Sequence, residues 1–236
     1  MTAKNETRIN EWFVPKFGPP RFRIFIGLLF LPYTGMCISF AIIGSLLVSD
    51  IAWDRLGAIA LIYGLALGVS AHAADSIGSK RVKPWGNYFT KRQLLLLMAT
   101  TLGAAYAIGI YYIVLFVPLL AIIALFEGFF LLAYNFEMFK GRFHNNFWFA
   151  ISWGSLPALG GYIMQTNSID MLPIAVAAIT GLISYVEIRI SRPYKALKQK
   201  GTDHKMAKRL EKGLKVISLG TIVFATALLA FRIFLS

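Results

Sequence analysis

The clearest chemistry in the sequence lies in a polar cluster that ends an apolar stretch. His72 and Asp75 are three positions apart, so their side chains share one face of a helix. An acid can hold Mg²⁺, which prefers oxygen ligands and phosphate partners, while Lys and Arg bind phosphate oxygens directly. The cluster therefore suits a phosphorylated ligand. The cations that follow the acid are Lys80, Arg81, Lys83 and Arg92.

A plainer interpretation is that a helix ends here in a polar cap and that the basic residues only orient the chain in a membrane. Taken alone, the cluster slightly favours that interpretation. Two similar clusters end other apolar stretches, however, and three acids at such edges exceed what orientation requires. These clusters contain Tyr134, Asn135, Glu137, Lys140, Arg142, His144 and Asn145 in the first, and Glu187 and Arg192 in the second.

The composition is that of a membrane protein. Hydrophobic residues make up 57% of the chain and charged residues 15%, whereas a soluble domain has nearer a quarter charged. The single Cys37 excludes both a disulfide framework and a cysteine-based metal site. The net charge of +13 comes from basic residues beside apolar runs. We therefore expect contact with anionic head groups or phosphorylated substrates, and no nucleic-acid partner.

The apolar runs predict an all-α transmembrane bundle of about seven helices, because each crossing needs about 20 apolar residues. A polar N-terminal segment, residues 1–23, precedes one transmembrane domain, residues 24–236. One apolar run is twice the length of a crossing, and we divide it at Tyr111 and Tyr112 because aromatic residues favour the membrane interface. The predicted spans are 24–48, 56–74, 94–112, 114–136, 147–164, 171–188 and 214–235.

The basic residues predict the orientation of these spans. With the N-terminus in the cytoplasm, all 24 lysines and arginines except Arg55 and Arg232 fall on the cytoplasmic side. We therefore expect a multi-pass plasma-membrane protein with its C-terminus outside and its active face in the cytoplasm. Residues 189–213 are predicted to be the one sizeable soluble loop. Residues 205–215, which begin in this loop, fit a short basic helix on the membrane surface. We interpret the positive charges from Lys195 to Lys215 as residues that orient the chain in the membrane.

Glu127 falls inside the fourth predicted span, with few polar neighbours in the sequence. It is either a buried functional acid or a neutral group that hydrogen-bonds across helices, and the two interpretations are equally supported. Gly154, Gly160 and Gly161 predict close helix packing rather than phosphate binding.

The cluster around Asp75 resembles the Asp-rich motif of the UbiA superfamily of intramembrane prenyltransferases. Residues 71–75 align with that motif, and Ser79 stands at the position of its last acidic residue. Residues 83–87 are similar to a Lys-Pro-Trp-containing stretch that follows in the family, and residues 90–93 resemble the start of its next helix.

A later segment is also similar to this family. Asn145 or Asn146, together with residues 154–162, resembles the family's Asn and Gly-Ser-x-Pro-x-x-x-Gly-Tyr segment. The resemblance covers roughly residues 21–192. It implies transfer of a prenyl group from a polyprenyl diphosphate to an aromatic or lipid acceptor, with Mg²⁺ as cofactor.

The resemblance also implies roles for individual residues. Asp75 and Glu187 would hold Mg²⁺, and His72 would act beside them in catalysis. His72 and Ser79 stand where the family usually has carboxylates, and typical members have nine helices. A catalytically inactive relative that binds an isoprenoid or a partner protein is therefore the alternative. A transporter ranks third, because no internal repeat is visible. The implied substrate-binding residues are Lys80, Arg81, Lys83, Arg92, Tyr134, Asn135, Lys140, Arg142, Asn145 and Arg192.

Overall fold

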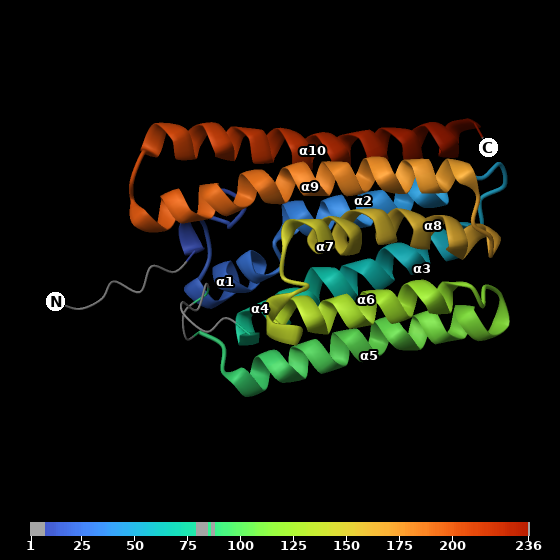
Figure 1. Ribbon diagram of the computed structural model, residues 1–236, viewed down its shortest axis with the longest axis horizontal. Coiled ribbons are helices and arrows are strands. Elements are labelled where there is room, and N and C mark those ends of the chain that lie inside the picture. Colours follow the sequence, from blue (N-terminus) through green and yellow to red (C-terminus); the bar gives the residue numbers. More distant parts are fainter. Residues whose placement is uncertain (1–7, 79–84, 86–87, 236) are drawn as a thin grey trace.

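The computed structural model describes residues 8–78, 85 and 88–235. In these residues it is an all-α bundle of seven helical rods, several of them interrupted (Figure 1), so the predicted all-α class and the number of about seven helices are confirmed. The elements are η1 (Arg8–Asn10), α1 (Pro20–Leu28), α2 (Leu31–Ser45), α3 (Trp53–Tyr63), η2 (Gly64–Ala71), α4 (His72–Gly78), α5 (Lys91–Leu115), α6 (Leu120–Asn135), η3 (Phe139–Gly141), α7 (Asn146–Ala150), η4 (Ile151–Ser155), α8 (Leu156–Thr166), α9 (Met171–Lys200) and α10 (His204–Leu235).

Five rods among the described residues are long and apolar enough to cross a membrane, which indicates a multi-pass integral membrane protein. The α6 helix is apolar but shorter. The remaining rod, residues 146–166, contains the π-helical turn η4. Large apolar side chains stay exposed on the outer helices α5 and α10, as a lipid-facing surface requires. Examples are Leu96, Val114, Val216, Val223 and Phe231.

The turn between α5 and α6 lies at residues 116–119, so the predicted break at Tyr111 and Tyr112 is wrong. Pro118 explains the difference. It has no backbone N–H and disfavours helical geometry in the residue before it, so the chain turns there. The two tyrosines remain inside the last turns of α5. At its other end, α5 begins with a capping box in which Thr90 and Gln93 hydrogen-bond to each other's backbone N–H.

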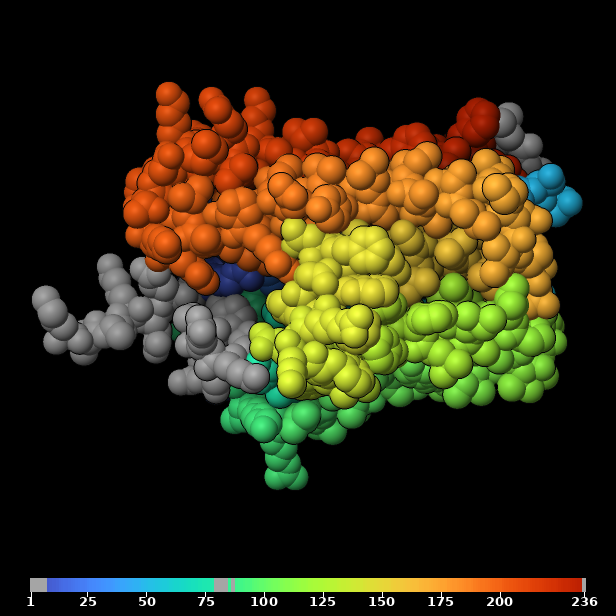
Figure 2. Space-filling model, in the orientation of Figure 1, coloured from blue at the N-terminus to red at the C-terminus, as the bar shows by residue number. Residues whose placement is uncertain are grey.

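The soluble loop predicted for residues 189–213 is also wrong. Helix α9 continues through Pro193 to Lys200, and α10 begins at His204. Residues 205–215 are therefore the first turns of a long helix rather than a separate surface helix. At 1.5 Å per residue the 30 residues of α9 span about 45 Å, which exceeds a hydrocarbon core of about 30 Å. The α9–α10 hairpin accordingly projects beyond the neighbouring helices at one end of the bundle (Figures 1 and 2).

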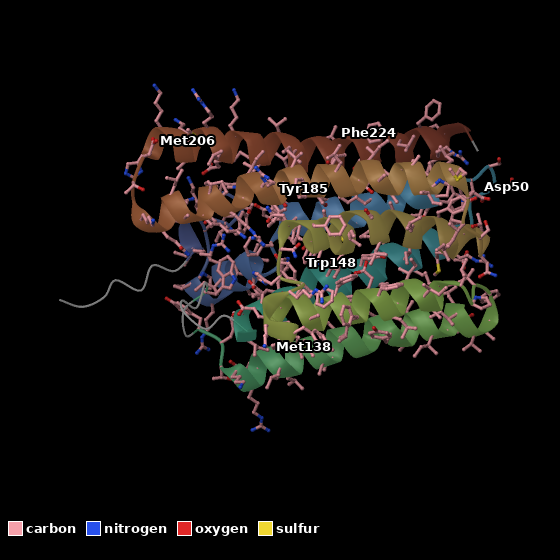
Figure 3. All side chains as sticks on the ribbon, in the orientation of Figure 1. Asp50, Met138, Trp148, Tyr185, Met206 and Phe224 are labelled. Carbon is pink, nitrogen blue, oxygen red and sulfur yellow. The ribbon has the colours of Figure 1, made fainter. Side chains whose placement is uncertain are left out.

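A polar network explains why this hairpin stays helical past Pro193. The Tyr194 hydroxyl lies 2.7 Å from Glu11 Oε2 and 3.1 Å from Glu211 Oε2. Lys198 Nζ lies 3.2 Å from Glu11 Oε2, and Lys215 Nζ lies 2.7 Å from Glu211 Oε1. The N-terminal segment, α9 and α10 are thus tied together outside the apolar part of the bundle. Long nitrogen-tipped side chains gather around the same hairpin (Figure 3).

Helix α2 packs backbone to backbone against α8, which confirms the close helix packing predicted for Gly161. A Cβ on Gly161 would lie 1.9 Å from the carbonyl oxygen of Ala41, and one on Gly44 would lie 1.9 Å from that of Ala158. The buried Ser45 hydroxyl donates to the Gly161 carbonyl at 3.0 Å. This contact fixes α8, and with it η4, against α2.

Candidate ligand-binding cavity

The floor of the candidate site is built at a break in the first rod. Phe30 adopts left-handed backbone angles, φ 45° and ψ 50°, between α1 and α2, and Pro32 then lies in the first turn of α2. Thr34 stabilises the break because its hydroxyl donates to the Leu29 carbonyl at 2.6 Å. A bulky residue in this conformation is strained, and such strain clusters at functional sites.

The break directs the Phe30 ring towards the second rod. Its centroid lies 4.9 Å from that of His72, in a stacked arrangement, and 5.4 Å from that of Tyr33. Two cations also approach this ring, with Arg8 Cζ at 4.8 Å and Lys195 Nζ at 5.6 Å from its centroid.

A cavity of about 270 Å³ lies above this floor, at the end of the bundle where α4 and α6 terminate. Its wall combines carboxylates, cations and aromatic rings drawn from helices that are far apart in the sequence. The lining residues are Phe30, Tyr33, His72, Asp75, Tyr134, Asn135, His144, Phe149, Trp153, Glu187, Ile188, Ser191, Arg192 and Lys195.

The structure therefore brings Asp75, Glu187 and Asn135 to one cavity, as expected from their positions at helix ends. The close approach of α4 to α6 depends on Gly78, where a Cβ would lie 2.2 Å from the Asn135 carbonyl oxygen. The Asn135 amide nitrogen donates to the Leu131 carbonyl at 2.7 Å, so its Oδ1 is the atom left for a ligand.

Glu187 is the most enclosed acid of the cavity. It is 1% exposed, and its Oε1 has no hydrogen-bond partner among the described residues. Tyr33 and Lys195 interact electrostatically with its carboxylate, and the Tyr33 hydroxyl lies 3.3 Å from Ser191 Oγ. An enclosed carboxylate oxygen without a partner is costly, and it indicates a place for a cation or a donor.

His72 lies between two aromatic rings at the inner end of the cavity. Its centroid is 4.9 Å from Phe30 and 5.2 Å from Trp153, and its buried Nε2 has no hydrogen-bond partner among the described residues. At the opposite wall the His144 ring stacks on Tyr134 at 4.4 Å, and its Nδ1 lies 2.9 Å from the Tyr134 carbonyl oxygen. The sequence placed His144 in a polar cluster at a helix end without a specific role, and the structure shows that it lines the cavity beside Tyr134.

Lys195 is the residue that the sequence interpretation missed. It was assigned to membrane orientation because α9 was expected to end at residue 188. In the continuous helix, Glu187, Ser191 and Lys195 follow each other at intervals of four and line one stripe of the cavity. Lys195 interacts electrostatically with both Asp75 and Glu187. The four-residue spacing was visible in the sequence, but only a helix that continues through Pro193 makes it meaningful.

Several predicted site residues lie elsewhere. Arg92, Glu137, Lys140 and Arg142 are not among the residues that line the cavity. The Asn145 side chain caps α7, accepting from the backbone N–H groups of Phe147 and Trp148 at 3.0 and 3.1 Å. Three predicted phosphate-binding residues fall outside the described residues: Lys80, Arg81 and Lys83.

The cavity wall carries oxygen donors of the kind that Mg²⁺ prefers, but too few to fill its coordination shell without further ligands. Mg²⁺ commonly takes one or two protein carboxylates and completes its shell with water and phosphate oxygens. Asp75, Glu187 and the Asn135 Oδ1 supply such oxygens, and the unpartnered Glu187 Oε1 is the strongest indication of a cation. Within the described residues no group of three or more His, Cys, Asp or Glu side chains is placed to hold a metal by itself.

The fold and this cavity define a class: a multi-pass helical membrane protein with a charged, aromatic-walled cavity at one end of the bundle. Comparison of the chain with protein-family models, with curated proteins and with solved structures finds no match.

Proposed function

We propose that the chain is a UbiA-like prenyltransferase that binds a polyprenyl diphosphate in this cavity and transfers the prenyl group to an aromatic or lipid acceptor. The observation that carries the proposal is the meeting of Asp75, Glu187 and Lys195 in one cavity with aromatic walls. Few ligands other than a phosphorylated amphiphile would use metal-binding oxygens, fixed cations and an apolar floor together.

Each group would have a distinct task. Asp75 and Glu187 would hold Mg²⁺, which when bound neutralises charge on the departing diphosphate. Lys195 and Arg192 would contact phosphate oxygens directly. The rings of Phe30, Phe149 and Trp153 would keep water from the allylic carbon and face its developing positive charge.

Lys195 would also compensate for the small number of metal-binding carboxylates in the sequence. His72 and Ser79 occupy positions where the resemblance leads one to expect carboxylates, so the chain has ligands for fewer metal ions. A fixed ammonium group within electrostatic reach of Asp75 and Glu187 supplies positive charge that a second ion would otherwise provide.

The alternative is a catalytically inactive relative that binds an isoprenoid or a partner protein. It is favoured by one observation, the small number of metal-ligating side chains that meet among the described residues. The two functions differ in what a chelator does. A transferase would lose product formation, while a simple binder would keep its affinity for the diphosphate.

The deciding experiment uses purified protein, a radiolabelled polyprenyl diphosphate and a pool of membrane acceptors, with and without a chelator. We expect Mg²⁺ to strengthen diphosphate binding and to be required for product, and Asp75→Asn to abolish the metal effect, because an amide is a poor ligand for this hard cation. Asp50→Asn, at an exposed position of the loop between α2 and α3, is the matched control and should behave as wild type.

Product formation that is unchanged in Asp75→Asn would eliminate the chosen site. If the protein bound the polyprenyl diphosphate tightly with or without the chelator and formed no product under any condition, the inactive binder would be favoured. Lys83→Ala is expected to weaken binding with or without metal, because a direct contact between a lysine and a phosphate does not depend on the metal.

We further propose that the N-terminus and the cavity mouth face the cytoplasm and that the C-terminus lies outside. The basis is the bias of Lys and Arg towards one set of loops. Single cysteines near Lys83, Lys140 and Lys200, in a background without the buried Cys37, should react with an impermeant reagent only from the cytoplasmic side. Labelling of any of them from outside would contradict this orientation.

A further inference from the structure

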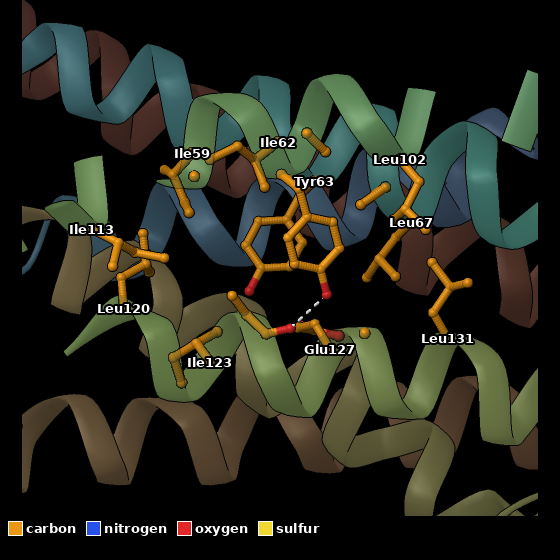
Figure 4. A pocket seen from close by; sticks show the side chains of 16 residues that line it. Ile59, Ile62, Tyr63, Leu67, Leu102, Ile113, Leu120, Ile123, Glu127 and Leu131 are labelled. Atoms are coloured by element: carbon orange, nitrogen blue, oxygen red, sulfur yellow. Dashed lines mark hydrogen bonds between the residues drawn. The ribbon is translucent and has the colours of Figure 1, made fainter. Parts of the chain in front are cut away.

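A second cavity lies in the middle of the bundle, between the α3–η2 rod, α5 and α6 (Figure 4). Its volume of about 60 Å³ is well above the roughly 10–15 Å³ that a single water needs. Almost all of its wall is hydrocarbon, contributed by residues such as Ile59, Leu67, Leu102 and Leu131. It shares no lining residue with the charged cavity at the end of the bundle.

Glu127 is the exception in this apolar wall. Its Oε2 accepts a hydrogen bond from Ser152 Oγ at 3.4 Å, whereas Oε1 is enclosed and has no hydrogen-bond partner among the described residues. Leaving a buried carboxyl oxygen without a hydrogen bond costs free energy of folding. Glu127 therefore either destabilises the fold or forms part of a binding site.

The two tyrosines of the cavity direct their hydroxyl hydrogens to backbone carbonyls. The Tyr63 hydroxyl donates to the Leu156 carbonyl at 3.1 Å, and the Tyr106 hydroxyl donates to the Ala124 carbonyl at 2.9 Å. Each hydroxyl has one hydrogen, so both are committed. Tyr63 lies beside Glu127 (Figure 4), and its hydroxyl interacts with the Glu127 carboxyl group. A ligand hydroxyl at this position can donate its hydrogen to Oε1.

Glycines hold these tyrosines in place. A Cβ on Gly128 would lie 2.0 Å from the Tyr106 hydroxyl oxygen, and one on Gly160 would lie 2.7 Å from that of Tyr63. Both hydroxyls therefore sit where no larger residue would allow them. The polar end of the cavity is a built arrangement, while the rest of its wall suits a hydrocarbon chain.

We propose that this cavity binds the hydroxyl end of a membrane-dissolved apolar alcohol, whose O–H donates to Glu127 Oε1. The remaining carbon skeleton lies against the apolar wall and extends towards the lipid beside α5 and α6, which are outer helices of the bundle (Figure 1). A water molecule is a poorer occupant, because it would face hydrocarbon over most of its surface. The site does not depend on the proposed transferase activity.

The test uses the full chain reconstituted in phosphatidylcholine nanodiscs and a dodecanol that carries a photoreactive diazirine next to its hydroxyl. We expect crosslinks in α5 and α6, and competition by dodecanol about tenfold stronger than by its methyl ether, because the ether has no hydrogen to donate to Glu127 Oε1. Glu127→Leu should remove that preference and lower labelling about tenfold.

Two glycines of α5 provide a matched pair of variants. Gly109 lines the cavity, and a Cβ there has nothing nearer than 4.0 Å, so Gly109→Leu fills the space without breaking the fold. Gly103 does not line it and has nothing within 4 Å, so Gly103→Leu is the control. Labelling should fall to background in the first variant and stay at the wild-type level in the second.

A measurement of thermal unfolding guards against misfolded variants. Glu127→Leu removes an unpartnered buried oxygen, so its melting temperature without ligand should be no lower than that of wild type. Equal competition by the alcohol and the ether would overturn the proposal, since the cavity would then accept any hydrocarbon chain. Labelling of Gly109→Leu at the wild-type level would overturn it as well.

Discussion

Gly161→Ala is expected to destabilise the bundle strongly, although the same change in an exposed helix is stabilising. The new Cβ would lie 1.9 Å from the Ala41 carbonyl oxygen and 3.0 Å from the Ser45 backbone nitrogen, so α8 would have to move away from α2. Overpacking of this kind costs about 1–3 kcal/mol and more where backbone must shift. The shift would also break the hydrogen bond from Ser45 to the Gly161 carbonyl.

Thermal unfolding in detergent, followed by circular dichroism, measures this effect. Gly57→Ala in α3 is the matched control, because nothing lies within 4 Å of its Cβ position. There the substitution should raise stability by up to about 1 kcal/mol through helix propensity alone. The two variants are thus expected to shift the melting temperature in opposite directions. An unchanged or higher melting temperature for Gly161→Ala would contradict the close packing of α2 on α8.

Lys195→Glu is expected to abolish diphosphate binding. The substitution removes a cation from the cavity and adds a third carboxylate beside Asp75 and Glu187. Loss of one charge-assisted contact costs about 1.5–3 kcal/mol, and the added repulsion increases this, so we expect affinity to fall about a hundredfold or more. Lys195→Arg should retain most of the binding, because it keeps the charge.

Equilibrium binding of a labelled polyprenyl diphosphate measures the loss. Lys200→Glu makes the same charge change at an exposed position near the end of α9 and serves as the control. If both variants weakened binding equally, the effect would come from the general basic charge of the hairpin. If Lys195→Glu bound as wild type, the cavity would not hold the diphosphate.

The sequence by itself determined the class of protein and the set of rods. Hydropathy along the chain is a local property, and a bilayer requires long uncharged runs whatever their partners. For that reason the all-α fold, the approximate places of the apolar helices and the clusters of acids at helix ends could be predicted without tertiary information. His72 and Asp75 share a helical face because of their spacing, and this too is local.

The boundaries that were mispredicted depended on contacts between distant segments. The sixth span was expected to end at residue 188, yet α9 continues through Pro193 because Tyr194 and Lys198 contact Glu11 and Glu211 from other parts of the chain. That continuation is what carries Lys195 to the cavity. No pattern within residues 189–200 contains the positions of those two acids.

The cavity itself was decided by tertiary structure. Phe30 reaches His72 only because the first rod breaks in a left-handed conformation, and Asp75 meets Glu187 only because α4 and α9 close on the same space. The same distinction between sequence and tertiary structure holds for Glu127. Its place inside an apolar span was evident from the sequence, but packing decides which oxygen finds a donor, and Oε1 was left without one among the described residues.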